Sequence, residues 1–133
     1  MEEQDSYKNS WILDEDLREE KPIDTARFIL AMNEMQAEVH HISNTKGWWD
    51  TWRNNGESIA LMHSELSEAL EAMRNGNPPD DKLPEFNSVA VELADVIIRI
   101  MDFAAGKGFN VIEALVSKVE YNRQREYRHG KEF

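Results

Sequence analysis

The chain has 133 residues and no cysteine; 41% of its residues are apolar and 31% are charged. This length fits one domain, and the lack of cysteine excludes a disulfide scaffold, a Cys-ligated zinc site, an iron–sulfur cluster and a cysteine nucleophile. With 26 acidic residues against 15 lysines and arginines, the net charge of −11 argues against a general binder of nucleic acid or of anionic membranes.

The start of the chain, residues 1–5, is acidic and polar, unlike a signal or transit peptide. The longest apolar stretches are shorter than the ~18–20 residues that span a bilayer. We therefore expect a cytoplasmic protein. Residues 1–23 predict an irregular acidic arm, and residues 24–133 predict a helical domain.

The first predicted helix begins with Asp24 as its N-cap and ends near Gly47. Its apolar residues follow a helical period and predict one stripe that faces a helical partner. They are Phe28, Met32, Met35, Val39 and Ile42. A loop rich in tryptophan follows, with Trp48, Trp49 and Trp52.

The second predicted helix runs from about Glu57 to Arg74. Its predicted core stripe is Ile59, Met62, Leu66, Ala69 and Met73. The third runs from Pro84, a favoured first-turn residue, to about Ala105. Because this third helix is apolar around most of its circumference, we expect it to be buried, in part against a second subunit.

A fourth helix is predicted from a capping-box-like start at Asn110 and Glu113. Its apolar face is Ile112, Leu115, Val116 and Val119, and it fades into a basic C-terminal segment. The fold class is therefore all-α, a bundle of four to five helices.

Two pairs of carboxylates occupy the second and third predicted helices. Glu65 and Glu68 lie one turn apart, as do Glu92 and Asp95. Buried carboxylates are costly unless they are paired or bind a metal, and a short linker makes the two helices antiparallel neighbours. The pairs would then form an oxygen-only site for Mg²⁺ or Mn²⁺. The alternative for Glu92 and Asp95 is a salt-bridge stripe with Arg99.

Two further groups of residues each have a functional and a structural interpretation. Lys118, Asn122 and Arg125 share one face of the fourth helix, which suits phosphate oxygens or an ordinary solvated basic face. The tryptophans either cover the edge of the core or stack on a planar base. His40 and His41 would line the same pocket or be structural.

The two acid pairs and their surroundings resemble a known family. Glu65-Leu-Ser-Glu68, followed after 23 residues by Glu92-Leu-Ala-Asp95, is similar to the E-x-x-E … E-x-x-D signature of the MazG-like all-α nucleoside triphosphate pyrophosphohydrolases. Residues 117–123 also look typical of this family, and the resemblance covers about residues 25–130. Many members carry a further Glu where this chain has Ser64.

The resemblance implies a homodimer or homotetramer that hydrolyses a nucleoside triphosphate to the monophosphate and pyrophosphate with Mg²⁺, in nucleotide-pool house-cleaning. The metal ligands would be Glu65, Glu68, Glu92 and Asp95, with Glu65 and Glu68 catalytic and Glu68 the expected general base. The phosphate contacts would be Lys118, Asn122 and Arg125. The base pocket would be His40, His41, Trp48 and Trp49.

Two rival interpretations remain open at this point. A di-iron carboxylate bundle would use Glu38-x-x-His41 and Glu126-x-x-His129, although His129 is followed by Gly130 in a basic terminal segment. An acidic helical interaction module would use the apolar third helix and the tryptophan loop as a docking surface. It explains the tryptophans but leaves the two acid pairs unexplained.

Overall fold

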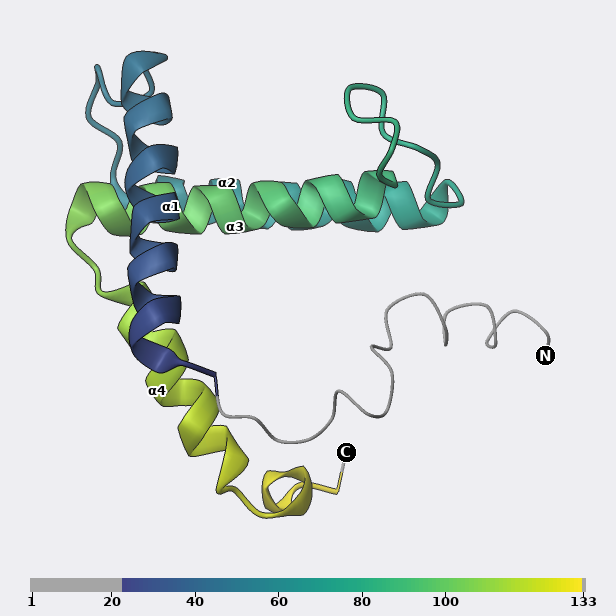
Figure 1. The fold of residues 1–133 in the computed structure, drawn as a ribbon. Helices are drawn as coiled ribbons and strands as arrows, with labels where there is room; N and C mark the ends of the chain where they lie inside the picture. The colour runs from purple at the N-terminus through teal and green to yellow at the C-terminus, as the bar shows by residue number, and fades with distance from the viewer. Residues whose placement is uncertain (1–22, 133) are drawn as a thin grey trace.

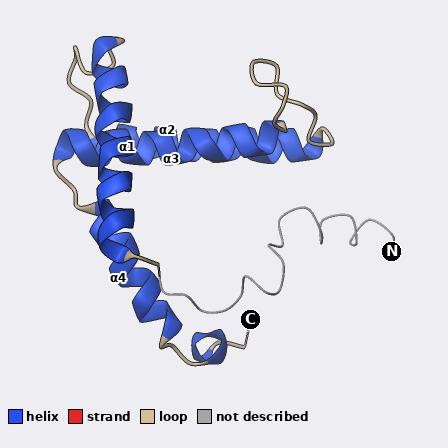
Figure 2. Ribbon diagram, viewed as in Figure 1, coloured by secondary structure: helices blue, strands red, loops and turns tan. Residues whose placement is uncertain are grey.

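The computed structural model describes residues 23–132, and in this range all regular structure is helical (Figure 2). The elements are α1 (Thr25–Thr45), α2 (Asn55–Arg74), α3 (Ser88–Lys107), α4 (Val111–Arg123) and the short 3-10 helix η2 (Tyr127–Gly130). The predicted all-α class is confirmed for these residues. Apart from Ile23, the predicted arm lies outside the described residues, as does residue 133.

Three helices begin with a side chain that caps a free backbone N–H group. Asp24 accepts from the backbone nitrogen of Arg27 at 3.1 Å, as predicted for α1. Asn54 caps α2, which therefore begins at Asn55, two residues before the predicted start. Asn87 caps α3. Each cap satisfies a donor that the first helical turn leaves unpaired.

The predicted start of the third helix at Pro84 is wrong, because the residues before α3 form an ordered turn. The buried carboxylate of Asp80 accepts from the backbone nitrogens of Lys82 and Leu83, each at 2.9 Å. Asn77 Oδ1 accepts from the nitrogen of Val89 at 3.0 Å. These bonds hold Pro84 in the turn, and proline suits a turn as well as a first helical turn.

The fourth helix also differs from its prediction. Asn110 donates to Glu113 through its amide but makes no side-chain cap to the helix backbone. The helix ends at Arg123, and the basic segment beyond it turns into η2, where Arg128 and His129 have positive φ angles of 52° and 55°.

The central element is α3, which packs against both α2 and α1. α2 and α3 lie side by side and antiparallel, joined by the loop at one end, while α1 crosses them near the C-terminal end of α3 (Figure 1). α4 packs against α1 and leads away from the α2–α3 pair (Figure 1). None of the described helices is long and apolar enough to cross a bilayer.

The buried core is small, and no described side chain is fully buried. The buried apolar residues are Ala69, Met101, Ala104 and Ile112. Much of the predicted core stripe of α2 is exposed instead: Ile59 by 43%, Leu66 by 45% and Met73 by 52%. The reason is that α2 packs chiefly against α3, so that only the part of its apolar stripe that faces α3 is covered.

Candidate metal site and tryptophan loop

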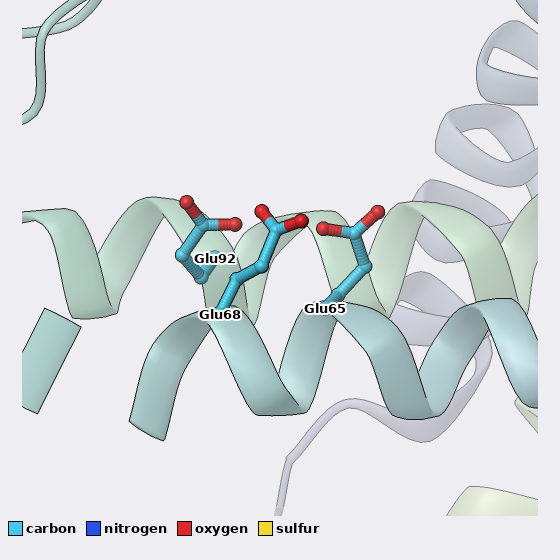
Figure 3. Close-up of side chains that lie close together, drawn as sticks. All are labelled: Glu65, Glu68 and Glu92. Atoms are coloured by element: carbon cyan, nitrogen blue, oxygen red, sulfur yellow. The ribbon is translucent and has the colours of Figure 1, made fainter. Parts of the chain in front are cut away.

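Three glutamates converge where α2 and α3 lie side by side. Glu65 and Glu68 come from successive turns of α2 and Glu92 comes from α3, and Figure 3 shows the Glu68 carboxylate between the other two. One carboxylate oxygen from each lies within 4.8 Å of the others. Among the described residues, this is the only group of three or more acidic or histidine side chains that converges in this way. Such oxygens suit a hard divalent cation.

We call Glu65, Glu68 and Glu92 the acid cluster, and its three members differ in their exposure to solvent. Glu65 is 8% exposed, Glu92 is half-buried and Glu68 is exposed. Desolvation by burial, the negative charge of Glu68 and a hydrogen bond with Glu68 raise the pKa of Glu92 to about 6. The cluster therefore carries mutual repulsion that a bound cation would relieve.

Asp95, the fourth predicted ligand, lies one turn beyond Glu92 on α3 and is half-buried. It is not part of the converging group, but the negative charges of Glu65 and Glu68 raise its pKa. Burial is the largest cause that raises the pKa of Asp95, and the charge of Glu65 adds to it, while the charges of Arg99 and Lys82 lower the pKa. Asp95 thus borders the acid cluster from the α3 side.

Arg99 pairs across the two helices. Its Nε donates to Glu65 Oε1 at 2.5 Å, so its hydrogen bond goes to α2 and not to an acid of its own helix. The salt-bridge stripe along α3, expected as the alternative for Glu92 and Asp95, is therefore replaced by a bond to the most buried acid of the cluster.

The tryptophan loop is anchored to α3 through Asp102. Asp102 accepts hydrogen bonds from Trp49 Nε1 at 2.9 Å and from Ser43 Oγ at 2.7 Å, and its Oδ1 lies 2.8 Å from His40 Nδ1. The His40 ring meets Trp49 edge-on, with ring centroids 5.0 Å apart. Trp49 and His40 are thus held together by a polar network that also fixes the loop, while neither His40 nor His41 lines the cavity beside Trp49.

A small cavity of about 40 Å³ lies between the tryptophan loop and α3. Its lining includes Trp48, Trp49, Arg53, Arg99, Asp102 and Lys107. Arg99 therefore contacts both this cavity and the acid cluster. With Phe103, three cationic and three aromatic side chains border this cavity, and their surface suits a ligand with both anionic and planar parts.

The remaining aromatic and histidine candidates are more exposed. Trp48 is 61% exposed, with the Arg53 guanidinium 5.9 Å from its ring centroid. Trp52 is 84% exposed, and Lys107 Nζ lies 3.7 Å from its centroid. His41 is exposed on α1. Of the two predicted base-binding tryptophans, Trp48 is the one with a free indole surface.

The predicted phosphate residues lie on α4. Lys118 and Arg125 both stand over the ring of Tyr121, at 4.6 Å and 5.7 Å, and Asn122 is exposed. Because α4 packs against α1 and leads away from the α2–α3 pair, one chain does not bring these residues to the acid cluster (Figure 1).

The residues of the di-iron alternative do not converge either. Glu38 and His41 are exposed on α1, and Glu126 and His129 are exposed near η2. Two other residues of the site escaped the sequence analysis. Asp102 binds the tryptophan loop, and the indole of Trp49 lies against Gly106, yet neither residue was predicted to belong to a site.

Comparison of the chain with protein-family models, curated proteins and solved structures gives no match.

Proposed function

We propose that this chain is a Mg²⁺-dependent nucleoside triphosphate pyrophosphohydrolase of the MazG-like all-α type. The observation that carries the proposal is the convergence of Glu65, Glu68 and Glu92 from two antiparallel helices, at the positions of the paired acid motif. The products would be a nucleoside monophosphate and pyrophosphate, as expected of a nucleotide house-cleaning enzyme.

The donor set fits a hard cation. Glu65, Glu68 and Glu92 would hold Mg²⁺ or Mn²⁺, with Asp95 beside them, because carboxylate oxygens are the preferred ligands of both ions. The bound metal supplies charge neutralisation on the phosphates and a lowered pKa for water. Glu68, the exposed member of the cluster, would accept a proton from the attacking water.

The surface around this cavity, beside the acid cluster, is the proposed place for the nucleotide, because a void of about 40 Å³ is itself too small to hold one. Arg53, Arg99 and Lys107 give this surface positive charge, and Trp48 offers an exposed indole to the base. Base stacking on an aromatic side chain is worth about 1–3 kcal/mol. Asp102 would act indirectly, by holding Trp49 and His40 in place.

A homo-oligomer is part of the proposal. Leu93, Ile97 and Ile98 on the central helix are each more than 40% exposed, as are large apolar residues of the other three α-helices. A monomer seldom leaves so much apolar surface open to water. If Lys118, Asn122 and Arg125 bind phosphate, a second copy must supply them, because α4 leads away from the acid cluster of its own chain.

The same exposed apolar residues favour a second candidate, a protein-interaction module without catalysis. The two candidates differ in their need for a metal. To separate them, folded protein is incubated with a panel of dNTPs, NTPs and modified nucleotides, with Mg²⁺ or with EDTA, and pyrophosphate is measured. The enzyme releases it from at least one nucleotide and only with the metal, whereas a docking module releases none.

A further inference from the structure

Arg99 connects two parts of the molecule that the proposed function uses separately. On one side its Nε donates to Glu65 Oε1 at 2.5 Å, inside the acid cluster. On the other side it lines the cavity that Trp48 and Trp49 border. Its side chain is 34% exposed, against 11% for the side chain of Glu65, so the arginine has room to move and the glutamate has little.

The bond to Glu65 occupies a group that a cation would need. Glu65 is the most buried acid of the cluster, and a buried carboxylate without a partner is strongly unfavourable. In the metal-free protein Arg99 supplies that partner. A divalent cation held by the same carboxylates would repel the guanidinium and compete with it for the Glu65 oxygens.

We propose that Arg99 is an exchangeable counter-ion of the acid cluster. It neutralises Glu65 in the absence of metal, leaves Glu65 when a divalent cation occupies the cluster, and then turns its guanidinium, which already lines the cavity, toward the surface that Trp48 and Trp49 border. There it joins Arg53 and Lys107 as a positioning residue for the anionic part of the substrate. The inference rests on the proposed metal site and adds a residue that couples that site to the surface proposed for the nucleotide.

Metal titrations of the metal-free protein by calorimetry test the exchange. The variant Arg99→Gln is compared with wild type and with Arg74→Gln, a control that removes an arginine from an exposed pair with Glu71 at 3.9 Å. Removing the competitor should tighten Mn²⁺ binding about tenfold, which corresponds to roughly 1.4 kcal/mol. The control should bind Mn²⁺ as wild type does.

Tryptophan fluorescence tests where the guanidinium goes. Addition of Mg²⁺ to wild type should change the indole emission, because the guanidinium of Arg99, freed from Glu65, moves relative to Trp48 and Trp49. In Arg99→Gln the change should be lost, although the metal binds. The metal-free variant should also melt below wild type, because Glu65 has lost its partner, and should gain more stability from Mg²⁺.

Equal or weaker Mn²⁺ binding by Arg99→Gln overturns the inference, because Arg99 would then orient Glu65 as a ligand. An unchanged fluorescence response in that variant overturns the proposed movement of the Arg99 guanidinium toward the tryptophans. Metal binding absent from both wild type and variant refutes the proposed metal site itself and this inference with it. Should Arg99→Gln not fold, Arg99→Lys is used instead, because lysine keeps the positive charge but lacks the planar guanidinium that can bind a carboxylate through two N–H groups. It should bind Mn²⁺ more tightly than wild type, and weaker or equal binding is contrary evidence.

Discussion

The indole ring of Trp49 lies against Gly106 so closely that a Cβ added to the glycine would stand 2.1 Å from Cη2 of the ring. Trp49 therefore occupies a slot that α3 provides only because residue 106 has no side chain. The hydrogen bond from Trp49 to Asp102, one turn earlier on α3, fixes the ring in that slot. This pairing of a loop with a helix shapes one wall of the small cavity that Trp49 lines.

We predict that Gly106→Ala destabilises the protein. In an ordinary helix the change would stabilise by up to about 1 kcal/mol, because alanine is the better helix former. Here Trp49 has to leave its slot, and overpacking of this kind costs about 1–3 kcal/mol. Chemical denaturation measures the free energy of unfolding and shows whether Gly106→Ala raises or lowers it. In a Trp49→Ala background the penalty should vanish, and a penalty that persists there would contradict the packing argument.

Replacing the two adjacent tryptophans should give opposite results. Trp49→Ala removes a packed, hydrogen-bonded ring and should lower the melting temperature. Trp48 is 61% exposed, so Trp48→Ala should leave the melting temperature almost unchanged. If Trp48 stacks on the base, its loss raises KM with little effect on kcat, by about 5- to 150-fold for 1–3 kcal/mol. An unchanged KM in Trp48→Ala would remove Trp48 from the base pocket.

The pKa of Glu92, raised by burial and by Glu68 to about 6 from an ordinary 4.5, predicts the pH dependence of the metal-free protein. Between those two values the folded state binds more protons than the unfolded state. For this group, stability therefore increases as pH falls from above 6 to 4.5. Thermal melting between pH 7.5 and 4.5 in EDTA measures this contribution, and Glu92→Gln should flatten it. The control variant Glu85→Gln, at an exposed residue, should leave the pH dependence of the melting temperature unchanged.

Metal binding should follow the opposite trend. The ligands must be deprotonated, so the apparent Mg²⁺ affinity should fall as pH drops through 6, and binding there should release protons. Calorimetry in two buffers of different ionisation enthalpy counts these protons. Binding that is independent of pH between 5 and 7.5 would argue that Glu92 is not a ligand.

The exposed apolar residues predict that the protein does not exist as a monomer at micromolar concentration. Light scattering should give a multiple of the 15.5 kDa chain mass. A charged residue at Ile97, which is 53% exposed on α3, should reduce that mass and the melting temperature together. A folded species of single-chain mass in wild type would rule out the oligomer.

Much of the fold could be predicted from local signals. The cap at Asp24 and the helical period of α1 were readable because they depend on residues close in sequence. The start of α3 was not, because Pro84 suits a turn and a helix alike, and the choice depends on backbone bonds to Asp80 and Asn77. Sequence patterns also overestimated burial, since they identify a face as apolar without saying what covers it.

The acid cluster shows the same limit. Antiparallel packing of two neighbouring helices predicted that Glu65, Glu68, Glu92 and Asp95 meet, and three of these converge while Asp95 is not part of the group. The partner of Arg99 was not predictable, because Asp95 stands four residues before it on the same helix while the actual partner, Glu65, lies on another. Contacts such as Trp49 with Gly106 depend on how elements pack, and no local pattern encodes them.

The most direct test of the proposed function is the identity of the products formed by wild type and by three matched variants. Glu65→Gln, Glu92→Gln and Asp95→Asn each remove one charge from the acid cluster or its border. With Mg²⁺ and the preferred nucleotide, wild type should yield one monophosphate and one pyrophosphate per triphosphate consumed, and each folded variant should lose most of that turnover. Release of orthophosphate instead of pyrophosphate, full activity in any two variants, or no turnover of any nucleotide by folded wild type would contradict the account.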